Sequence, residues 1–314
     1  MTGVIRDSRQ AKIKAKIKTD SSWRPPLAVT TTVLAWASAF VVIRYAAHDI
    51  HPGALALGRL LVASLALSAM MIGRRLVRLS GREWALTAVV GVAWFAGYSI
   101  ALNAGEQHVD AGTASMLIQL APILIGVLAG ILLGEGFPRM LVIGGLVAFA
   151  GTLIIGIATS TGKASLMGVL LILLSAALYS IALVAQKVVL RRIPALQVTW
   201  LACLIGAVAC LPFAGQLVAD IAAAPALQII GVIYLGLVPT ALAFSTWAYA
   251  LKHSTAGRLG VTTFLVPPIT ILLGWLFLGE VPPPLAIVGG ALSLVGVAIA
   301  TRLPRRPIRV ASGK

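Results

Sequence analysis

Apolar residues along this chain come in runs of about twenty, and short polar breaks separate one run from the next. A run of this length is what an α-helix needs to cross the hydrocarbon core of a bilayer. The pattern therefore predicts an all-α integral membrane protein with ten transmembrane helices. The predicted spans are 27–47, 54–73, 84–104, 112–133, 140–158, 166–187, 196–216, 226–250, 257–278 and 284–301.

Composition supports this class and narrows the function. Of the 314 residues, 59% are hydrophobic and 11% are charged, whereas about 25% are charged in a typical soluble domain. The loops between the predicted spans average roughly eight residues, which is too short for a folded soluble domain, a nucleotide site or a metal cluster. We therefore expect the protein to act inside the bilayer, with no cofactor, no metal site and no enzymatic activity.

The net charge of +16 reflects the predicted topology. If the N-terminus is cytoplasmic, 22 of the 25 Lys and Arg residues lie in cytoplasmic segments or tails, as the positive-inside rule requires. This predicts a protein of the cell inner membrane with both termini in the cytoplasm. The basic tails are expected to lie on anionic lipid headgroups rather than to bind nucleic acid.

The second half of the chain repeats the first. A shift of 145 residues aligns the fourth and fifth predicted spans with the ninth and tenth, so that Gly134-Glu135 matches Gly279-Glu280. Each half holds five spans, and an odd number reverses the second half relative to the first. The expected units are a basic tail (1–26), a first five-helix repeat (27–158), a second, inverted repeat (159–301) and another basic tail (302–314).

Several motifs are typical of one family. They are Ala35-Trp36-Ala37-Ser38-Ala39-Phe40 in the first span, Arg59 in the second, and the doubled patterns from Pro122 to Gly134-Glu135 and from Pro267 to Gly279-Glu280. In these residues the chain resembles, from about 27 to 301, the EamA-type transporters of the drug/metabolite transporter superfamily. The resemblance implies a ten-helix bacterial exporter of small metabolites with one central cavity between the halves. Because both repeats are in one chain, either a monomer or a homodimer is compatible with this arrangement.

Polar and aromatic residues far from span ends are the candidates for binding a solute at the middle of the bilayer. Ser and Thr in membrane helices also serve packing, and Trp and Tyr also form interfacial belts, so a structural role is the alternative for each candidate. The predicted substrate-binding residues are Trp36, Ser38, Trp94, Tyr98, Gln119, Tyr179, Trp247, Thr263 and Phe264.

Prolines and two glutamates are the candidates for conformational change. A proline inside a span frees a backbone carbonyl, which either bends the helix for packing or allows the two halves to rock. The two glutamates follow equivalent glycines, and they either close the ends of their spans against a neighbouring Arg or remain solvated. The predicted hinge and gating residues are Pro122, Pro239, Pro267, Pro268, Glu135 and Glu280.

Arg59 is a strongly basic residue inside a predicted span. Its guanidinium either reaches the lipid headgroups or grips a carboxylate of the substrate. All nine acidic residues lie in tails, loops or span ends, so none is placed to bind a cation at the centre of the membrane.

These features favour a secondary transporter that exports small metabolites by alternating access. An aromatic cavity with hydroxyls and amides suits amino acids, including aromatic ones, or related compounds. The alternative is a permease for the uptake or exchange of another small neutral metabolite, such as a sugar or nucleoside, or a drug exporter. A membrane protein without transport activity fits the inverted repeats less well.

Overall fold

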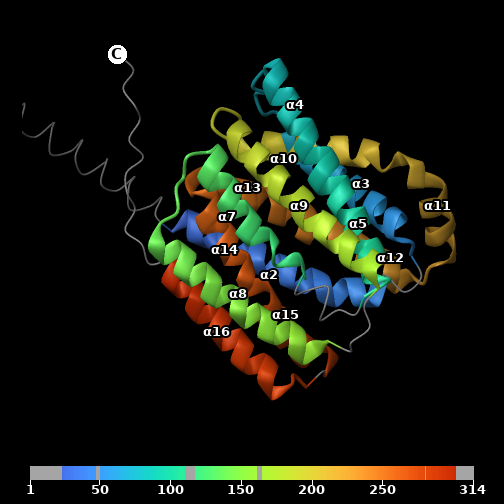
Figure 1. The fold of residues 1–314 in the computed structure, drawn as a ribbon. Helices are drawn as coiled ribbons and strands as arrows, with labels where there is room; N and C mark the ends of the chain where they lie inside the picture. The colour runs from blue at the N-terminus through green and yellow to red at the C-terminus, as the bar shows by residue number, and fades with distance from the viewer. Residues whose placement is uncertain (1–22, 47–49, 110–116, 161–164, 280, 302–314) are drawn as a thin grey trace, which may run out of the picture.

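The computed structural model describes residues 23–46, 50–109, 117–160, 165–279 and 281–301. Every regular element in these ranges is a helix (Figure 1). Within them, seven helices are long and apolar enough to cross a membrane, or eight if one bent pair counts as a single span. The all-helical membrane architecture is therefore confirmed, whereas the count of ten spans and their inverted arrangement remain predictions.

Many predicted spans coincide with one helix, and others consist of several helical segments in a row. In the first half the segments are α2 (Arg24–Ala46), α3 (Pro52–Met71), α4 (Gly81–Val89), η1 (Val90–Tyr98), α5 (Ser99–Glu106), α7 (Ala121–Leu132) and α8 (Arg139–Thr159). In the second half they are α9 (Leu166–Val189), α10 (Ala195–Ala209), η2 (Leu211–Phe213), α11 (Ala214–Ala223), α12 (Ala226–Leu235), η3 (Gly236–Leu242), α13 (Ala243–His253), α14 (Ala256–Val261), η4 (Thr262–Leu265), α15 (Val266–Leu278) and α16 (Pro284–Thr301).

Two predicted spans have a different shape from the one expected. The span predicted at 196–216 is broken after α10, and the next helical segment turns away by 52°. Pro212 lies in the short η2 segment at this break, where proline removes a backbone donor and disfavours a continuous helix. In the span predicted at 112–133, α7 begins only at Ala121, and residues 110–116 lie outside the described part of the chain.

The helix bundle has two ends that differ in their contacts. At one end of the bundle α2 ends and α3 begins, and we call this the α2/α3 end. At the opposite end α13 ends and α14 begins, and we call this the α13/α14 end. The first half of α2 lies against α13, where the hydroxyls of Thr32 and Thr246 are 2.7 Å apart. Farther along α2, the hydroxyl of Ser38 lies 2.7 Å from that of Tyr234 on α12. The helix α2 therefore runs antiparallel to the span formed by α12, η3 and α13. Under the predicted topology the α13/α14 end faces the cytoplasm.

Two spans contain a π-helical segment near their middle. These are η1 within α4–η1–α5 and η3 within α12–η3–α13. A π segment bonds each N–H to the carbonyl five residues back, and such segments are frequent at functional sites. Because the extra residue rotates all later side chains around the helix axis, these two segments decide which aromatic side chains face the centre of the bundle.

Glycines bring the backbones of α8 and α16 into direct contact, and Figure 1 shows the two helices side by side. A Cβ atom built on Gly151 would lie 2.5 Å from the carbonyl oxygen of Gly289, and one on Gly296 would lie 2.2 Å from the amide nitrogen of Ala148. Such distances exclude any side chain, so this close approach requires glycine. The outer faces of the two helices carry exposed apolar residues such as Ile157, as expected for surfaces that contact lipid.

Candidate functional site

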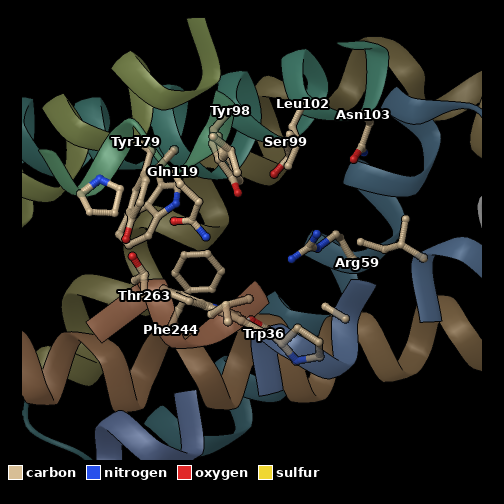
Figure 2. Close-up of a pocket in the computed structure, with 17 residues that line it drawn as sticks. Trp36, Arg59, Tyr98, Ser99, Leu102, Asn103, Gln119, Tyr179, Phe244 and Thr263 are labelled. Atoms are coloured by element: carbon tan, nitrogen blue, oxygen red, sulfur yellow. The ribbon is translucent and has the colours of Figure 1, made fainter. Parts of the chain in front are cut away.

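A cavity of about 110 Å³ lies inside the bundle (Figure 2). This volume is several times what one ordered water molecule requires. Residues from both halves of the chain line it, including Trp36 on α2, Trp94 on η1, Tyr179 on α9 and Phe244 on α13. On α2 the lining continues beyond Trp36 through later residues as far as Ile43, so the cavity extends from the middle of the bundle toward the α2/α3 end.

Aromatic rings form the inner wall of the cavity. The ring of Trp94 lies 4.7 Å from that of Tyr179 and 4.8 Å from that of Phe244, measured between centroids. Trp36 lies 5.5 Å from Phe244 and 4.9 Å from Trp247. Contacts at these distances are favourable, and they present apolar faces to a solute while restricting the motion of each ring. The cluster therefore separates the cavity from the α13/α14 end.

Pro239 connects the π segment η3 to the cavity. Its carbonyl oxygen accepts a hydrogen bond of 3.2 Å from the indole nitrogen of Trp36, which fixes the orientation of that ring. Pro239 has no N–H, so it cannot donate to the carbonyl of Leu235 one helical turn earlier. The hydroxyl of Thr240 donates to this carbonyl instead, at 2.7 Å.

Arg59 is a positively charged residue of the cavity lining, and its guanidinium points into the open space (Figure 2). The Nε atom of Arg59 donates a hydrogen bond of 3.1 Å to the hydroxyl of Thr240. Within the described residues, the ion pairs join other residues, His51 with Asp220 and Arg192 with Glu83. Arg59 is thus held by a neutral group, and its charge is left available to a ligand in the cavity.

The hydroxyl of Thr240 should be needed to position Arg59. In Thr240→Val, the carbonyl of Leu235 loses the hydroxyl as a donor and the Nε atom of Arg59 loses its acceptor, at a cost of about 1–3 kcal/mol in the free energy of unfolding. We expect the Michaelis constant for the transported solute to rise several-fold, because the guanidinium is no longer held in one orientation. Thermal unfolding and transport assays measure the two effects.

Thr240→Ser keeps the hydroxyl and is the matched control. It should retain an affinity for the solute close to that of the wild type. An equal affinity in the Val and Ser variants would show that this hydroxyl does not position Arg59.

The structure brings most of the predicted binding residues together around the cavity. Arg59 and the prolines Pro122 and Pro239 also line it. Pro122 lies in the first turn of α7, where its missing N–H breaks no helical bond. The predicted binding residues found in the lining are Trp36, Trp94, Tyr98, Gln119, Tyr179 and Thr263.

The other predicted binding residues lie away from the cavity. Ser38 is hydrogen-bonded to Tyr234 on α12. Trp247 is fully buried behind Trp36, and Phe264 is fully buried in an apolar cluster near Phe149. These three side chains therefore take part in packing in the conformation described here.

The remaining hinge and gating candidates occupy other positions. Pro267 and Pro268 lie in the first turn of α15, outside the cavity lining. Glu135 lies at the α13/α14 end, where its carboxylate accepts hydrogen bonds from the amides of Ala256 at 2.8 Å and Gly257 at 3.1 Å. Its observed partners are thus the N–H groups at the start of α14, which neither predicted alternative, a neighbouring Arg or a solvated carboxylate, included. Glu280 lies outside the described residues.

Several lining residues were not identified from the sequence. Leu102 lies four residues after Tyr98 on the same span, and this helical spacing was the available signal. Ser99 directly follows Tyr98, so its spacing gave no such signal. Phe244 follows the π segment η3. Counting 3.6 residues per turn through this segment therefore places the side chain of Phe244 on the wrong face of the helix. The lining residues that were not predicted include Ala39, Ile43, Ser99, Leu102, Phe244 and Val266.

Comparison with known proteins identifies the class. The model of the EamA-like transporter family matches residues 24–157 and again residues 166–302. A "Probable terminal-alkyne amino-acid exporter" of Streptantibioticus cattleyicolor is 36% identical over 277 residues, which cover 88% of this chain and 92% of that protein. The "Uncharacterized transporter YdfC" of Bacillus subtilis is 30% identical and covers 83% of this chain and 86% of its own.

A solved structure supports the fold. This structure, described as "Crystal structure of protein", superimposes with a TM-score of 0.73 at 23% identity over 90% of this chain and 99% of that one. The chain described here belongs to the EamA-like transporter family, within the drug/metabolite transporter superfamily. It is a multi-pass membrane transporter of small molecules.

Proposed function

We propose that this transporter exports amino acids with apolar or aromatic side chains, or closely related metabolites, by alternating access through the central cavity. The observation that carries the proposal is the guanidinium of Arg59, which has no ion-pair partner among the described residues and points into an aromatic cavity. A guanidinium binds a carboxylate through two parallel hydrogen bonds. An amino acid supplies that carboxylate and an apolar side chain for the aromatic wall.

The aromatic wall suits the rest of such a molecule. The faces of Trp36, Trp94 and Tyr98 offer apolar contact to a side chain and an electrostatic attraction to an ammonium group. Gln119 adds an amide to the lining, and it can donate or accept a hydrogen bond. The name of the relative from Streptantibioticus cattleyicolor, "Probable terminal-alkyne amino-acid exporter", supports the same substrate class.

The conformation also fits alternating access. The cavity extends toward the α2/α3 end, and the aromatic cluster and the contacts of Glu135 lie between the cavity and the α13/α14 end. The positive-inside pattern of the sequence places the α13/α14 end in the cytoplasm of the cell and both termini on the same side. With this orientation, the conformation supports the proposal of an exporter in the inner membrane, described in its outward-facing state.

Counterflow in proteoliposomes tests the proposal. Vesicles are preloaded with one member of a panel of amino acids, sugars and nucleosides, with or without a pH gradient, and the uptake of the labelled compound is measured. We expect exchange of a labelled aromatic amino acid by the wild type. Trp36→Ala and Tyr98→Ala should each lower the rate about tenfold, because each removes aromatic contact worth roughly 1–2 kcal/mol.

Trp275→Ala is the matched control, because Trp275 is 51% exposed on α15 and lies outside the cavity lining. Its exchange rate should equal that of the wild type once the amount of folded protein is measured. If the folded wild type exchanges no amino acid but does exchange a sugar or nucleoside, the amino-acid hypothesis is wrong.

A further inference from the structure

Three buried polar side chains between the cavity and the α13/α14 end have atoms without hydrogen-bond partners among the described residues. These atoms are the hydroxyl of Tyr179, both amide atoms of Gln186 and the indole nitrogen of Trp247. Gln186 and Trp247 are fully buried, and Tyr179 is 7% exposed. Buried polar groups are almost always paired, so each exception needs a physical explanation.

Other polar side chains in this region are paired. Ser180, on the same helix as Tyr179, donates to the carbonyl of Ala176 at 2.6 Å and lies 3.2 Å from that of Ala121. Gln197 on α10 is buried to a similar degree as Gln186, and its amide forms two hydrogen bonds with the backbone of Val77. The unpaired atoms of Tyr179, Gln186 and Trp247 therefore contrast with the paired side chains beside them.

The unpaired groups form a path that leaves the inner wall of the cavity. Tyr179 lines the cavity, and Gln186 lies seven residues farther along α9. Seven residues are two helical turns, so both side chains lie on the same face, about 10.5 Å apart along the axis. Trp247, on α13, lies directly behind Trp36 with a centroid distance of 4.9 Å.

Hydrogen bonds hold the α13/α14 end closed beyond this path. Lys187 on α9 donates to the carbonyls of Leu251 and Ser254, where α13 ends. Glu135 accepts from the amides of Ala256 and Gly257, where α14 begins. These backbone groups belong to the last turn of α13, the residue after it and the first turn of α14. The bonds are made by side chains, so this closure can open without unfolding any helix.

We propose that Tyr179, Gln186 and Trp247 line the closed half of the solute pathway. When the α13/α14 end opens, these groups contact the amino acid as it moves between the cavity and that end. The inference rests on the proposed transport function and extends the pathway from Tyr179 in the cavity lining to Gln186 and Trp247 outside it. The unpaired groups are explained because their partners are the solute and the water that enters in the second state.

The chemistry of these groups suits a zwitterion. The indole N–H of Trp247 and the phenol of Tyr179 can donate to the carboxylate, while the Gln186 amide donates to the carboxylate and accepts from the ammonium group. The three side chains are neutral, so they interact with both ends of the solute without retaining it through a full charge.

Thiol labelling tests whether Gln186 becomes accessible. Gln186→Cys in proteoliposomes is exposed to a cationic methanethiosulfonate reagent on each side of the membrane in turn, and mass spectrometry identifies the modified cysteines. We expect modification of Cys at 186 by reagent at the α13/α14 side. The native Cys203 and Cys210, both buried, are internal controls and should remain unmodified.

Transport provides the second readout. Gln186→Leu should lower the exchange rate about tenfold or more with no loss of thermal stability, because the unpaired amide is replaced by an apolar group of similar size. Gln197→Leu is the matched control: it removes paired hydrogen bonds, so thermal stability should fall while exchange per folded molecule is retained.

The two proposals fail separately. Labelling of Gln186→Cys that is no faster than labelling of Cys203, or exchange by Gln186→Leu at the wild-type rate, overturns the pathway even if the wild type transports amino acids. A wild type that transports no amino acid overturns the proposed substrate, and the labelling still decides whether the path opens.

Discussion

Replacing Arg59 with methionine should lower the transport of an amino acid by at least roughly 30-fold without reducing the thermal stability of the protein. Removal of one partner from a buried, hydrogen-bonded charge pair costs about 2–5 kcal/mol, and 2 kcal/mol corresponds to roughly 30-fold. Stability should be unchanged or higher, because the guanidinium has no ion-pair partner among the described residues and methionine places no charge in the cavity. Counterflow rates and thermal unfolding measure the two effects.

Two comparisons separate binding of a carboxylate from a general effect on the cavity. Arg59→Lys retains the positive charge but not the planar donor pair, so its transport rate should lie between those of the wild type and the methionine variant. A primary amine with the same side chain as the amino acid but no carboxylate should inhibit transport of the labelled amino acid only weakly. The inhibition should be equally weak in the wild type and in Arg59→Met. Transport of the amino acid by Arg59→Met at the wild-type rate would contradict the assignment.

The helical architecture could be predicted from the sequence because the length of an apolar run is a direct physical requirement of the bilayer. Predicted spans such as 54–73 and 284–301 correspond closely to α3 and α16. The break after α10 was missed because the apolar run continues through it. Pro212 was the signal for this break, and it changes the path of the helix without changing its hydropathy.

The chemistry of the cavity could be predicted better than its geometry. Trp36 and Trp247 are both tryptophans in the interior of a span, but one lines the cavity and the other is buried behind it. The face of Trp247 depends on the π segment η3 that precedes it, and the sequence of this segment does not differ visibly from that of an ordinary apolar α-helix. The role of Thr240 was also hidden, because its hydroxyl reaches the carbonyl of Leu235 only where Pro239 cannot donate to that carbonyl.

Replacing Gly151 with leucine should prevent the protein from accumulating in folded form, or lower its melting temperature by roughly 10 °C or more. A Cβ atom at this position would lie 2.5 Å from both the carbonyl oxygen of Gly289 and the amide nitrogen of Ser293. These are backbone atoms of α16, so they cannot rotate away as a side chain would. The two helices must separate, and the contacts between them are then lost along their length.

Gly145→Ala on the same helix is the matched control. The nearest atom to its added Cβ atom is a methyl carbon of Val261 at 3.6 Å, which is an ordinary contact. This variant should be as stable as the wild type or slightly more stable, because alanine loses less conformational freedom than glycine on helix formation. Equal melting temperatures for Gly151→Leu and Gly145→Ala would show that α8 and α16 do not meet at their backbones.

The effect of Gly151 should be confined to stability, because neither α8 nor α16 contributes a residue to the cavity lining. Gly151→Ala, with a smaller clash, should yield some folded protein with a reduced melting temperature. Each folded molecule should then exchange the same amino acids at the wild-type rate. This is the opposite of the result expected for Arg59→Met, so comparing the two variants in one assay separates the residues that hold the bundle together from those that recognise the solute.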